Sequence, residues 1–371
     1  MAVALDMPSA GRSLWGDAWL RLRANRAAMT SIVLLVLMTV VCIVGPWLSP
    51  HGHDQVYRDY VKVPASLDAY PRADAIRPAV ERALRRARAD IAAIEVGDDS
   101  VTVTLTSRRA IDERITRYLD RANLFDNAAV VGHADDGRRI VLSADIDRKL
   151  FLFGTDANGR DLFTRTLVAG RISLLIGLLA TGVALVIGVS YGAVAGYLGG
   201  RVDDVMMRIV DVLYALPFMF FVILLVVFFG RSIVLMFIAV GAIEWLDMAR
   251  IVRGQTLSIK RQEYVQAAQA LGVDTMGVLT RHIVPNTLGP VVVFMTLMVP
   301  KVILLESFLS FLGLGVQEPM TSWGVLIAEG SRNIQGAAWL LIFPSAFLAV
   351  TLFCLNFIGD GLRDALDPKD R

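Results

Sequence analysis

Long apolar, uncharged runs separated by short polar segments make up most of this chain, apart from one polar stretch in its first half. Five runs reach or nearly reach the length of a membrane span: residues 27–50, 172–200, 212–230, 282–300 and 333–359. Lys301 and Glu306 interrupt the fourth run, which then continues to about Leu314. A helix that crosses the hydrocarbon core of a bilayer needs about 20 apolar residues. The pattern therefore predicts transmembrane helices.

A sixth apolar run, residues 232–243, is short and ends before Glu244. The tail 1–26 and the loop 247–285 are both rich in arginine or lysine, and such segments favour the cytoplasmic side of a membrane. An even number of crossings must then separate them, so 232–243 has to span as well. We therefore expect six transmembrane helices, with both the N-terminus and the C-terminal tail 360–371 in the cytoplasm.

The polar stretch between the first two spans has the pattern of a small folded domain. Its expected elements are a helix over Ala75–Ala93, a strand over Ser100–Thr106, a second helix over Ile111–Leu119, and a hairpin of Ala128–Val131 and Arg139–Ser143 around Asp135-Asp136-Gly137. We expect an inserted extracytoplasmic α+β domain over residues 60–148. Its many arginines are compatible with translocation, because long translocated domains are exempt from the charge rule.

Composition agrees with a membrane protein. The chain is 55% hydrophobic and only 19% charged, whereas about a quarter of an ordinary soluble domain is charged. The net charge of +2 is too small to indicate a nucleic-acid partner. Cys42 and Cys354 both lie in apolar runs, so we expect buried free thiols and no disulfide framework. The first run lacks a small-residue cleavage site and is interpreted as a retained helix, not a signal peptide.

These patterns predict an all-α polytopic membrane protein with one inserted domain. The expected division is a cytoplasmic tail 1–26, a first transmembrane helix 27–48, the α+β domain 60–148, a five-helix core 165–359 that contains the cytoplasmic loop 247–285, and a C-terminal tail 360–371.

A ladder of four glycines marks one face of the second span. Gly188, Gly192, Gly196 and Gly200 recur at every fourth position. Small residues at this spacing allow close contact between the backbones of neighbouring helices. We interpret the ladder as a packing face, and sliding along this groove during gating is the alternative.

The loop 263–285 has the pattern of two short helices. Tyr264, Ala267, Ala268 and Leu271 recur at the spacing of one helix face. Glu263 lies in the first turn, where the helix dipole favours an anion, and Gly272 is the type of residue that ends a helix. Because a stripe centred on two alanines lets another surface approach closely, the first helix is expected to be a docking element.

The second helix of this loop is expected to begin at Asp274 as its cap and to end at Pro285. Between these positions Met276, Leu279 and Ile283 supply an apolar face.

A few ionisable residues are candidates for a solute-path, metal-binding or phosphate-binding site. Glu306 lies inside an apolar run, where a charge is costly, and is interpreted as a partner of another helix or as part of the solute path. His51 and His53 are two ligands at most and do not make a metal site, so we expect a solvated loop there. None of the five lysines follows a glycine, which excludes a Gly-Lys phosphate-binding loop.

The motifs together resemble a known family. The stretch containing Glu263, Ala267, Ala268, Leu271, Gly272 and Pro285 resembles the EAA motif of permease subunits in ABC-type importers, with Gln266 where the family usually has Glu. Residues 153–161 (Phe-Gly-Thr-Asp-Ala-Asn-Gly-Arg-Asp) look like a signature of dipeptide, oligopeptide and nickel permeases. Further matches follow in order at 285–286, 305–306, 310–315, 322–324, 328–330 and 356–368. The resemblance covers about 150–371 and the first span.

The resemblance implies the fold of a type I importer permease in the plasma (inner) membrane, without catalytic residues, cofactor or metal. It implies a membrane lipid environment and three kinds of protein partner: a second permease subunit, ATPase subunits docked on 263–285, and an extracytoplasmic solute-binding protein. The implied solute is a di- or oligopeptide, with nickel or another solute still open.

Two other classes of membrane protein fit the sequence less well. A membrane sensor that binds ligand with residues 60–148 would need a cytoplasmic output domain, for which the polar segments on that side are too short. A secondary transporter or channel would be expected to show internal repeats or charged residues within several spans, and neither is evident.

Overall fold

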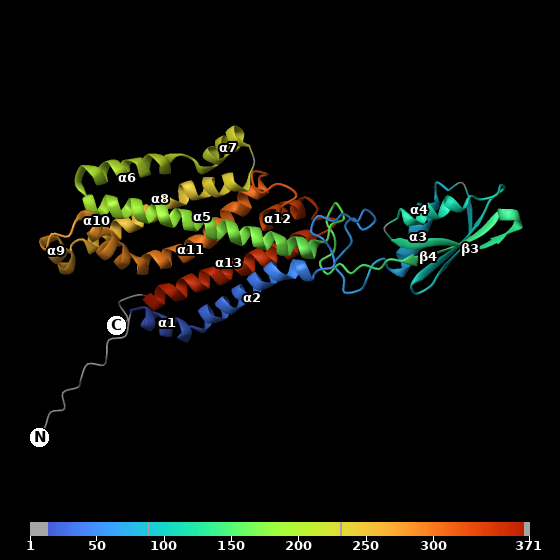
Figure 1. The fold of residues 1–371 in the computed structure, drawn as a ribbon, viewed down its shortest axis with the longest axis horizontal. Coiled ribbons are helices and arrows are strands. Elements are labelled where there is room, and N and C mark those ends of the chain that lie inside the picture. The colour runs from blue at the N-terminus through green and yellow to red at the C-terminus, as the bar shows by residue number, and fades with distance from the viewer. Residues whose placement is uncertain (1–13, 88, 123, 231, 367–371) are drawn as a thin grey trace, which may run out of the picture. The chain divides into compact units, whose positions relative to one another are not determined.

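The computed structural model describes residues 14–87, 89–122, 124–230 and 232–366. These residues form two compact units, which Figure 1 shows together with the order of the elements. The helical unit contains the described residues up to Leu48, Thr166–Glu329 and those from Leu341 onward, and the sheet unit contains Ser49–Arg165 and Gly330–Leu340.

Helices dominate the chain. Apart from α3 (Ala73–Leu84) and α4 (Arg117–Asp120) of the sheet unit, they are in order α1 (Leu14–Ala24), α2 (Arg26–Leu48), α5 (Leu162–Leu198), α6 (Gly200–Ala215), α7 (Phe218–Phe229), α8 (Ile233–Ile259), α9 (Glu263–Ala270), α10 (Thr275–Val278), α11 (Val284–Phe311), α12 (Trp323–Arg332) and α13 (Trp339–Leu366). A π-helical turn, Leu279–Ile283, joins α10 to α11. The pair α8 and α11 makes extensive contact, and α6 and α7 also pack on α8.

Four helical segments of the described residues are long and apolar enough to cross a membrane: Arg26–Leu48, Leu162–Leu198, Thr275–Phe311 and Trp339–Leu366. A fifth is reached if the bent pair of Gly200–Ala215 and Phe220–Phe229, which turns by 83°, counts as one span. The run 232–243 begins α8, which continues into charged sequence as far as Ile259. Its crossing of the membrane stays a prediction.

The sheet unit is built on a four-stranded antiparallel sheet in the order β1-β2-β4-β3. The strands are β1 (Asp90–Val96), β2 (Ser100–Thr106), β3 (Phe125–Ala134) and β4 (Arg139–Ile146). Helix α3 (Ala73–Leu84) precedes β1, and a 3-10 turn (Glu113–Thr116) followed by α4 (Arg117–Asp120) lies between β2 and β3.

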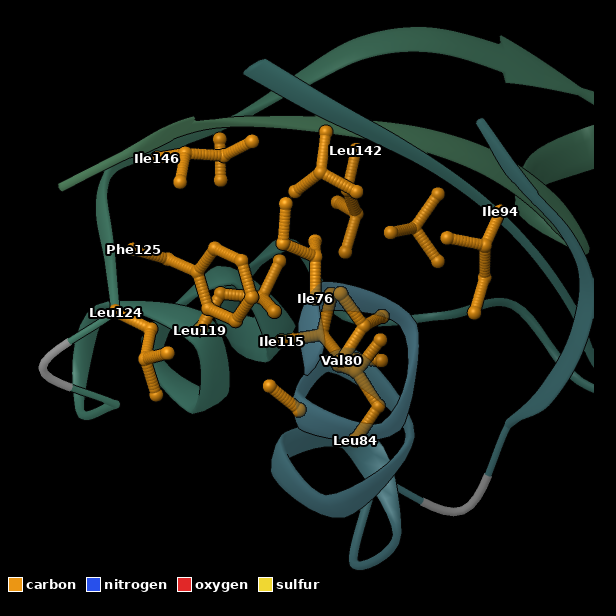
Figure 2. Packing of buried hydrophobic residues seen from close by; sticks show 14 of the residues in the cluster. Ile76, Val80, Leu84, Ile94, Ile115, Leu119, Leu124, Phe125, Leu142 and Ile146 are labelled. Atoms are coloured by element: carbon orange, nitrogen blue, oxygen red, sulfur yellow. The ribbon is translucent and has the colours of Figure 1, made fainter. Parts of the chain in front are cut away.

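Apolar side chains from α3, α4 and the sheet form one core. Figure 2 shows Ile76, Val80 and Leu84 of α3 pointing toward Leu142 of β4. In β2 the burial of the side chains follows the alternating sequence pattern. Val101, Val103 and Leu105 are buried, while the threonines between them are half-buried. The same cluster continues beyond the sheet to Tyr57 and Phe151.

The predicted strand Ser100–Thr106 is confirmed, but the helix Ala75–Ala93 was predicted too long. Helix α3 ends at Leu84, and Asp90–Val96 forms the edge strand β1. Only Ile94 of this strand is buried, so its burial lacks the clear alternation by which β2 was recognised.

Candidate functional site

The first helix of the predicted docking loop is α9, and its end is determined by Gly272. The backbone φ of Gly272 is +81°, a conformation that glycine adopts without strain. The N–H of Gly272 donates to the carbonyl of Gln269 (3.0 Å), and that of Val273 donates to Ala268 (3.1 Å). These two bonds form a Schellman motif, which stops α9 and turns the chain toward α10.

The expected apolar stripe of α9 divides between two environments. Ala268 and Val265 are buried in the helical unit, whereas Ala267 is exposed and Leu271 is 85% exposed. Gln269 donates a hydrogen bond from Nε2 to the hydroxyl of Tyr197 (3.0 Å), which ties α9 to α5. One side of α9 therefore holds the helix on its own unit, and the other side is exposed.

The second helix begins as expected but does not end where it was predicted to end. Asp274 caps α10 by accepting a hydrogen bond from the N–H of Gly277 (3.3 Å). Pro285 then lies in the first turn of α11, and the helix continues to Phe311. In the π-helical turn before it, the N–H of Val284 donates five residues back to the carbonyl of Leu279. Pro285 therefore marks a change of helix geometry, not a stop.

Three of the four ladder glycines lie against α8. A Cβ added to Gly188 would come within 2.5 Å of the Met248 side chain, and one on Gly192 within 2.3 Å of the Ala249 carbonyl. A Cβ on Gly196 would come within 2.9 Å of the Arg253 carbonyl.

Gly200 does not share this packing role, because no atom lies within 4 Å of its Cβ position. It begins α6 with φ +54°, so a glycine is favoured there by the backbone conformation.

Glu306 is completely buried, and serines surround its carboxylate. Ser310 donates to Oε1 (2.7 Å) and Ser173 of α5 donates to Oε2 (3.2 Å). The hydroxyl of Ser173 also accepts a hydrogen bond from the backbone N–H of Trp323 (3.2 Å). The cluster joins α5, α11 and the start of α12, so the geometry favours the interpretation of Glu306 as a helix partner.

Sequence reasoning missed a second charged cluster, formed by Glu244 and Asp247 of α8 with Lys301 of α11. The Lys301 ammonium lies 3.0 Å from Glu244 Oε2 and 2.9 Å from Asp247 Oδ2. The available signal was that Glu244 and Lys301 both occur beside apolar runs that were expected to span.

In the sheet unit, the 153–161 motif forms a buried polar cluster. Asp156 accepts hydrogen bonds from Arg160 Nε (2.7 Å) and from Nη1 of Arg165, and both arginines are almost fully buried. Asp161 caps α5 by accepting from the N–H (2.8 Å) and hydroxyl (2.6 Å) of Thr164. Burial raises the pKa of Asp161, while these hydrogen bonds oppose the rise.

The motif also fixes the loop before it. The backbone N–H of Thr155 donates a hydrogen bond to the carbonyl of Val63 (2.9 Å), and that of Tyr57 donates to the carbonyl of Gly159 (3.0 Å). A Cβ on Gly159 would lie only 2.2 Å from the Tyr57 carbonyl, so this backbone contact depends on glycine.

Metal binding finds no support among the described residues, where no group of three or more His, Cys, Asp or Glu side chains is placed to hold an ion. The prediction of a solvated loop was wrong for His51. This side chain is buried, with Nδ1 2.9 Å from the Tyr57 hydroxyl and Nε2 3.1 Å from the Leu150 carbonyl. Both cysteines are free and buried, as expected.

Comparison with known proteins identifies the family. A family model for the inner membrane component of binding-protein-dependent transport systems matches residues 188–371, and one for the N-terminal TM domain of oligopeptide transport permease C matches 13–65. The oligopeptide transport system permease protein OppC of Escherichia coli (strain K12) is 45% identical over 361 residues, which cover 97% of this chain and 93% of the relative.

Two further relatives agree. OppC of Haemophilus influenzae is 41% identical over 366 residues, 99% of this chain and 92% of the relative. The dipeptide transport system permease protein DppC of Bacillus subtilis (strain 168) is 37% identical over 356 residues, 96% of this chain and 86% of the relative. The chain therefore belongs to the family of inner membrane components of binding-protein-dependent transport systems.

Proposed function

We propose that this chain forms one half of the membrane channel of an ATP-driven importer of di- or oligopeptides. The observation that carries this proposal is its similarity, over nearly the full length, to permeases named for oligopeptide and dipeptide transport. These relatives favour a transporter over a membrane sensor. ATP hydrolysis is then the work of a separate ATPase chain.

Reconstitution tests this function. Proteoliposomes that contain this chain, a second permease subunit, the ATPases and the binding protein should accumulate a radiolabelled tripeptide only when ATP is supplied. Uptake of nickel without uptake of peptide would contradict the solute class. Peptide uptake that is independent of ATP would contradict the proposed mechanism.

The exposed side of α9 and α10 is proposed to dock on the ATPase. Leu271 and Met276 are 85% and 65% exposed, although both are apolar, and Ala267 is exposed beside Leu271. Exposed apolar side chains that lie together favour a protein contact. ATP-driven movement of the ATPases would then reach the spans through the continuous helical segment Thr275–Phe311.

An arginine at position 267 tests the docking surface. Ala267→Arg should leave the fold intact, because the side chain is exposed, yet should uncouple ATP hydrolysis from peptide uptake. Ala129→Arg, at an exposed position of β3, is the matched control and should transport normally. Normal uptake by a stably assembled Ala267→Arg complex would contradict docking at this surface.

We further propose six transmembrane helices, cytoplasmic termini, and an inserted extracytoplasmic domain over 60–148. The helical segments described above support four or five spans, and α8 would supply the remaining one. A cysteine introduced at Asp135 should react with an impermeant maleimide added outside. Cysteines introduced at Lys260 and Asp364 should react only when the reagent reaches the cytoplasmic side. Labelling of positions 260 and 364 from opposite faces would contradict this topology.

The inserted domain is proposed to modulate transport by contacting an acidic surface of the binding protein. Two hollows of about 460 and 750 Å³ share Tyr118 and Arg121 on its surface. Exposed arginines line them: Arg82, Arg85, Arg86, Arg109, Arg114, Arg117 and Arg121. Arginine is well suited to carboxylate recognition because its donors form a planar fork.

Charge reversal tests this contact. The double variant Arg85→Glu/Arg121→Glu should raise the concentration of binding protein needed for half-maximal uptake, and high salt should reduce the difference from wild type. Arg139→Glu, on β4 and outside both hollows, is the control. Identical dependence on binding protein in all three complexes would remove the proposed role.

A further inference from the structure

Lys301 places a charge on an exposed side of a helix that is expected to cross the membrane. It lies ten residues before the end of α11 at Phe311, about 15 Å along the axis at 1.5 Å per residue. Its side chain is 55% exposed within this chain. A charge that faces lipid at such depth is costly, and ionisable residues in spans face the bundle interior or a water-filled path. This side of α11 is therefore not a lipid surface.

A cavity of about 560 Å³ opens beside Lys301. Leu304, Phe308 and Phe311 of α11 form much of its wall, and α12 and α13 also contribute side chains. Among the described residues that line it, Glu244 and Lys301 alone are charged. Mixed walls of this kind suit a solute that carries apolar groups together with a charge.

Glu244 has an incompletely satisfied carboxylate in this cavity. Its side chain is only 3% exposed, and Oε2 accepts no well-aligned hydrogen bond within the described part of the chain. The nearby Lys301 ammonium supplies opposite charge but is shared with Asp247. A buried carboxylate that shares its one cationic partner with a second carboxylate gains from a further donor supplied by a ligand. The two carboxylates also exceed the single lysine by one negative charge.

We propose that Glu244 binds an ammonium group of the peptide as it passes through the channel, while Leu304, Phe308 and Phe311 contact its apolar side chains. An ammonium brings three hydrogen-bond donors and a positive charge, and Glu244 otherwise shares the single ammonium of Lys301 with Asp247. The group is either the α-ammonium of the peptide or a lysine side chain. The inference rests on the proposed peptide import and names a contact along its path.

Glu244→Gln tests the site in the reconstituted importer, because it keeps the shape of the side chain and removes its charge. Three tripeptides with different side-chain charge serve as solutes: Ala-Lys-Ala, Ala-Ala-Ala and Ala-Glu-Ala. Uptake is expressed per assembled complex, at saturating binding protein. We expect about a tenfold slower rate, the scale of one lost charge-assisted hydrogen bond. Glu95→Gln, exposed on β1, is the matched control.

The solutes distinguish the two sources of the ammonium. Slowing confined to Ala-Lys-Ala identifies the lysine side chain, and equal slowing of all three identifies the α-ammonium. Lys301→Gln should act in the opposite direction and speed the same solutes, because it removes the competing cation from Glu244. This second variant separates a solute contact from a purely structural ion pair, which both substitutions would weaken.

Wild-type rates in both variants would overturn the inference, and so would equal slowing by both variants. A fall in uptake that is fully explained by a loss of assembled complex would also overturn it, because Glu244 would then belong to a subunit interface. If the wild-type importer carries none of the three tripeptides, the proposed function itself fails and this inference falls with it.

Discussion

At the scale of single residues, the most sensitive positions are glycines where another backbone lies so close that no Cβ atom would fit. Gly192 shows this for the helical unit, since its Cβ position lies 2.3 Å from a backbone carbonyl and 2.9 Å from a backbone nitrogen of α8. Backbone atoms cannot rotate away as a side chain does. A substitution here must separate α5 from α8.

Gly192→Ala should therefore destabilise the assembled protein by about 1–3 kcal/mol, the usual cost of overpacking. Gly182→Ala is the matched control on the same helix, because no atom lies within 4 Å of its Cβ position. Thermal unfolding of the two purified variants in the same detergent measures the difference. Equal midpoints would show that α5 and α8 are not in close contact.

Asp156 is the corresponding residue of the sheet unit. Asp156→Asn would leave Arg160 and Arg165 buried without their carboxylate, which typically costs about 3–5 kcal/mol. We expect low yield and a lower unfolding midpoint, whereas Asp99→Asn at an exposed position should behave as wild type. A midpoint for Asp156→Asn equal to that of the control would mean that the remaining contacts of the two arginines compensate for the loss of this carboxylate.

At the scale of elements, local signals were predicted well and tertiary pairings were not. Gly272 and Asp274 act on neighbouring backbone groups, so their sequence patterns were sufficient to find the end of α9 and the start of α10. The helix continues through Pro285 after a π-helical turn, and nothing in the sequence composition predicts such a turn. The pairing of Glu244 with Lys301 joins two distant helices, and spacing along one chain does not reveal it.

The turn at Gly272 carries a prediction about the docking element. Gly272→Ala should strain the positive φ by about 1–2 kcal/mol and shift α9 relative to α10, and so weaken coupling between ATP hydrolysis and uptake. Gly272→Asn should be milder, because asparagine tolerates this conformation. The ratio of peptide transported to ATP hydrolysed is the measurement. Equal ratios in the two variants and the wild type would show that the angle of this turn is not critical.

At the scale of the whole molecule, family motifs account for the helical unit, whereas the sheet unit was predicted only from its pattern of apolar and polar residues. The motifs of the helical unit agree with the family match over 188–371, so its function followed from the sequence. The sheet unit carries no family motif between residues 60 and 148, so the sequence indicates its bounds only through the positions where regular patterns begin and end.

The core of the sheet unit indicates which fragment should fold alone. Tyr57 and Phe151 belong to the same buried cluster as the sheet, and both lie outside 60–148. A fragment of residues 49–165 should therefore unfold cooperatively and at a higher temperature than 60–148. Loss of a buried aromatic ring typically costs about 3–5 kcal/mol, a large part of the stability of a domain this size. Circular dichroism melts of both fragments test this, with Phe151→Ala in the longer one expected to lower its midpoint toward that of the shorter. Equal midpoints for the two fragments would place the folding boundary at 60–148 after all.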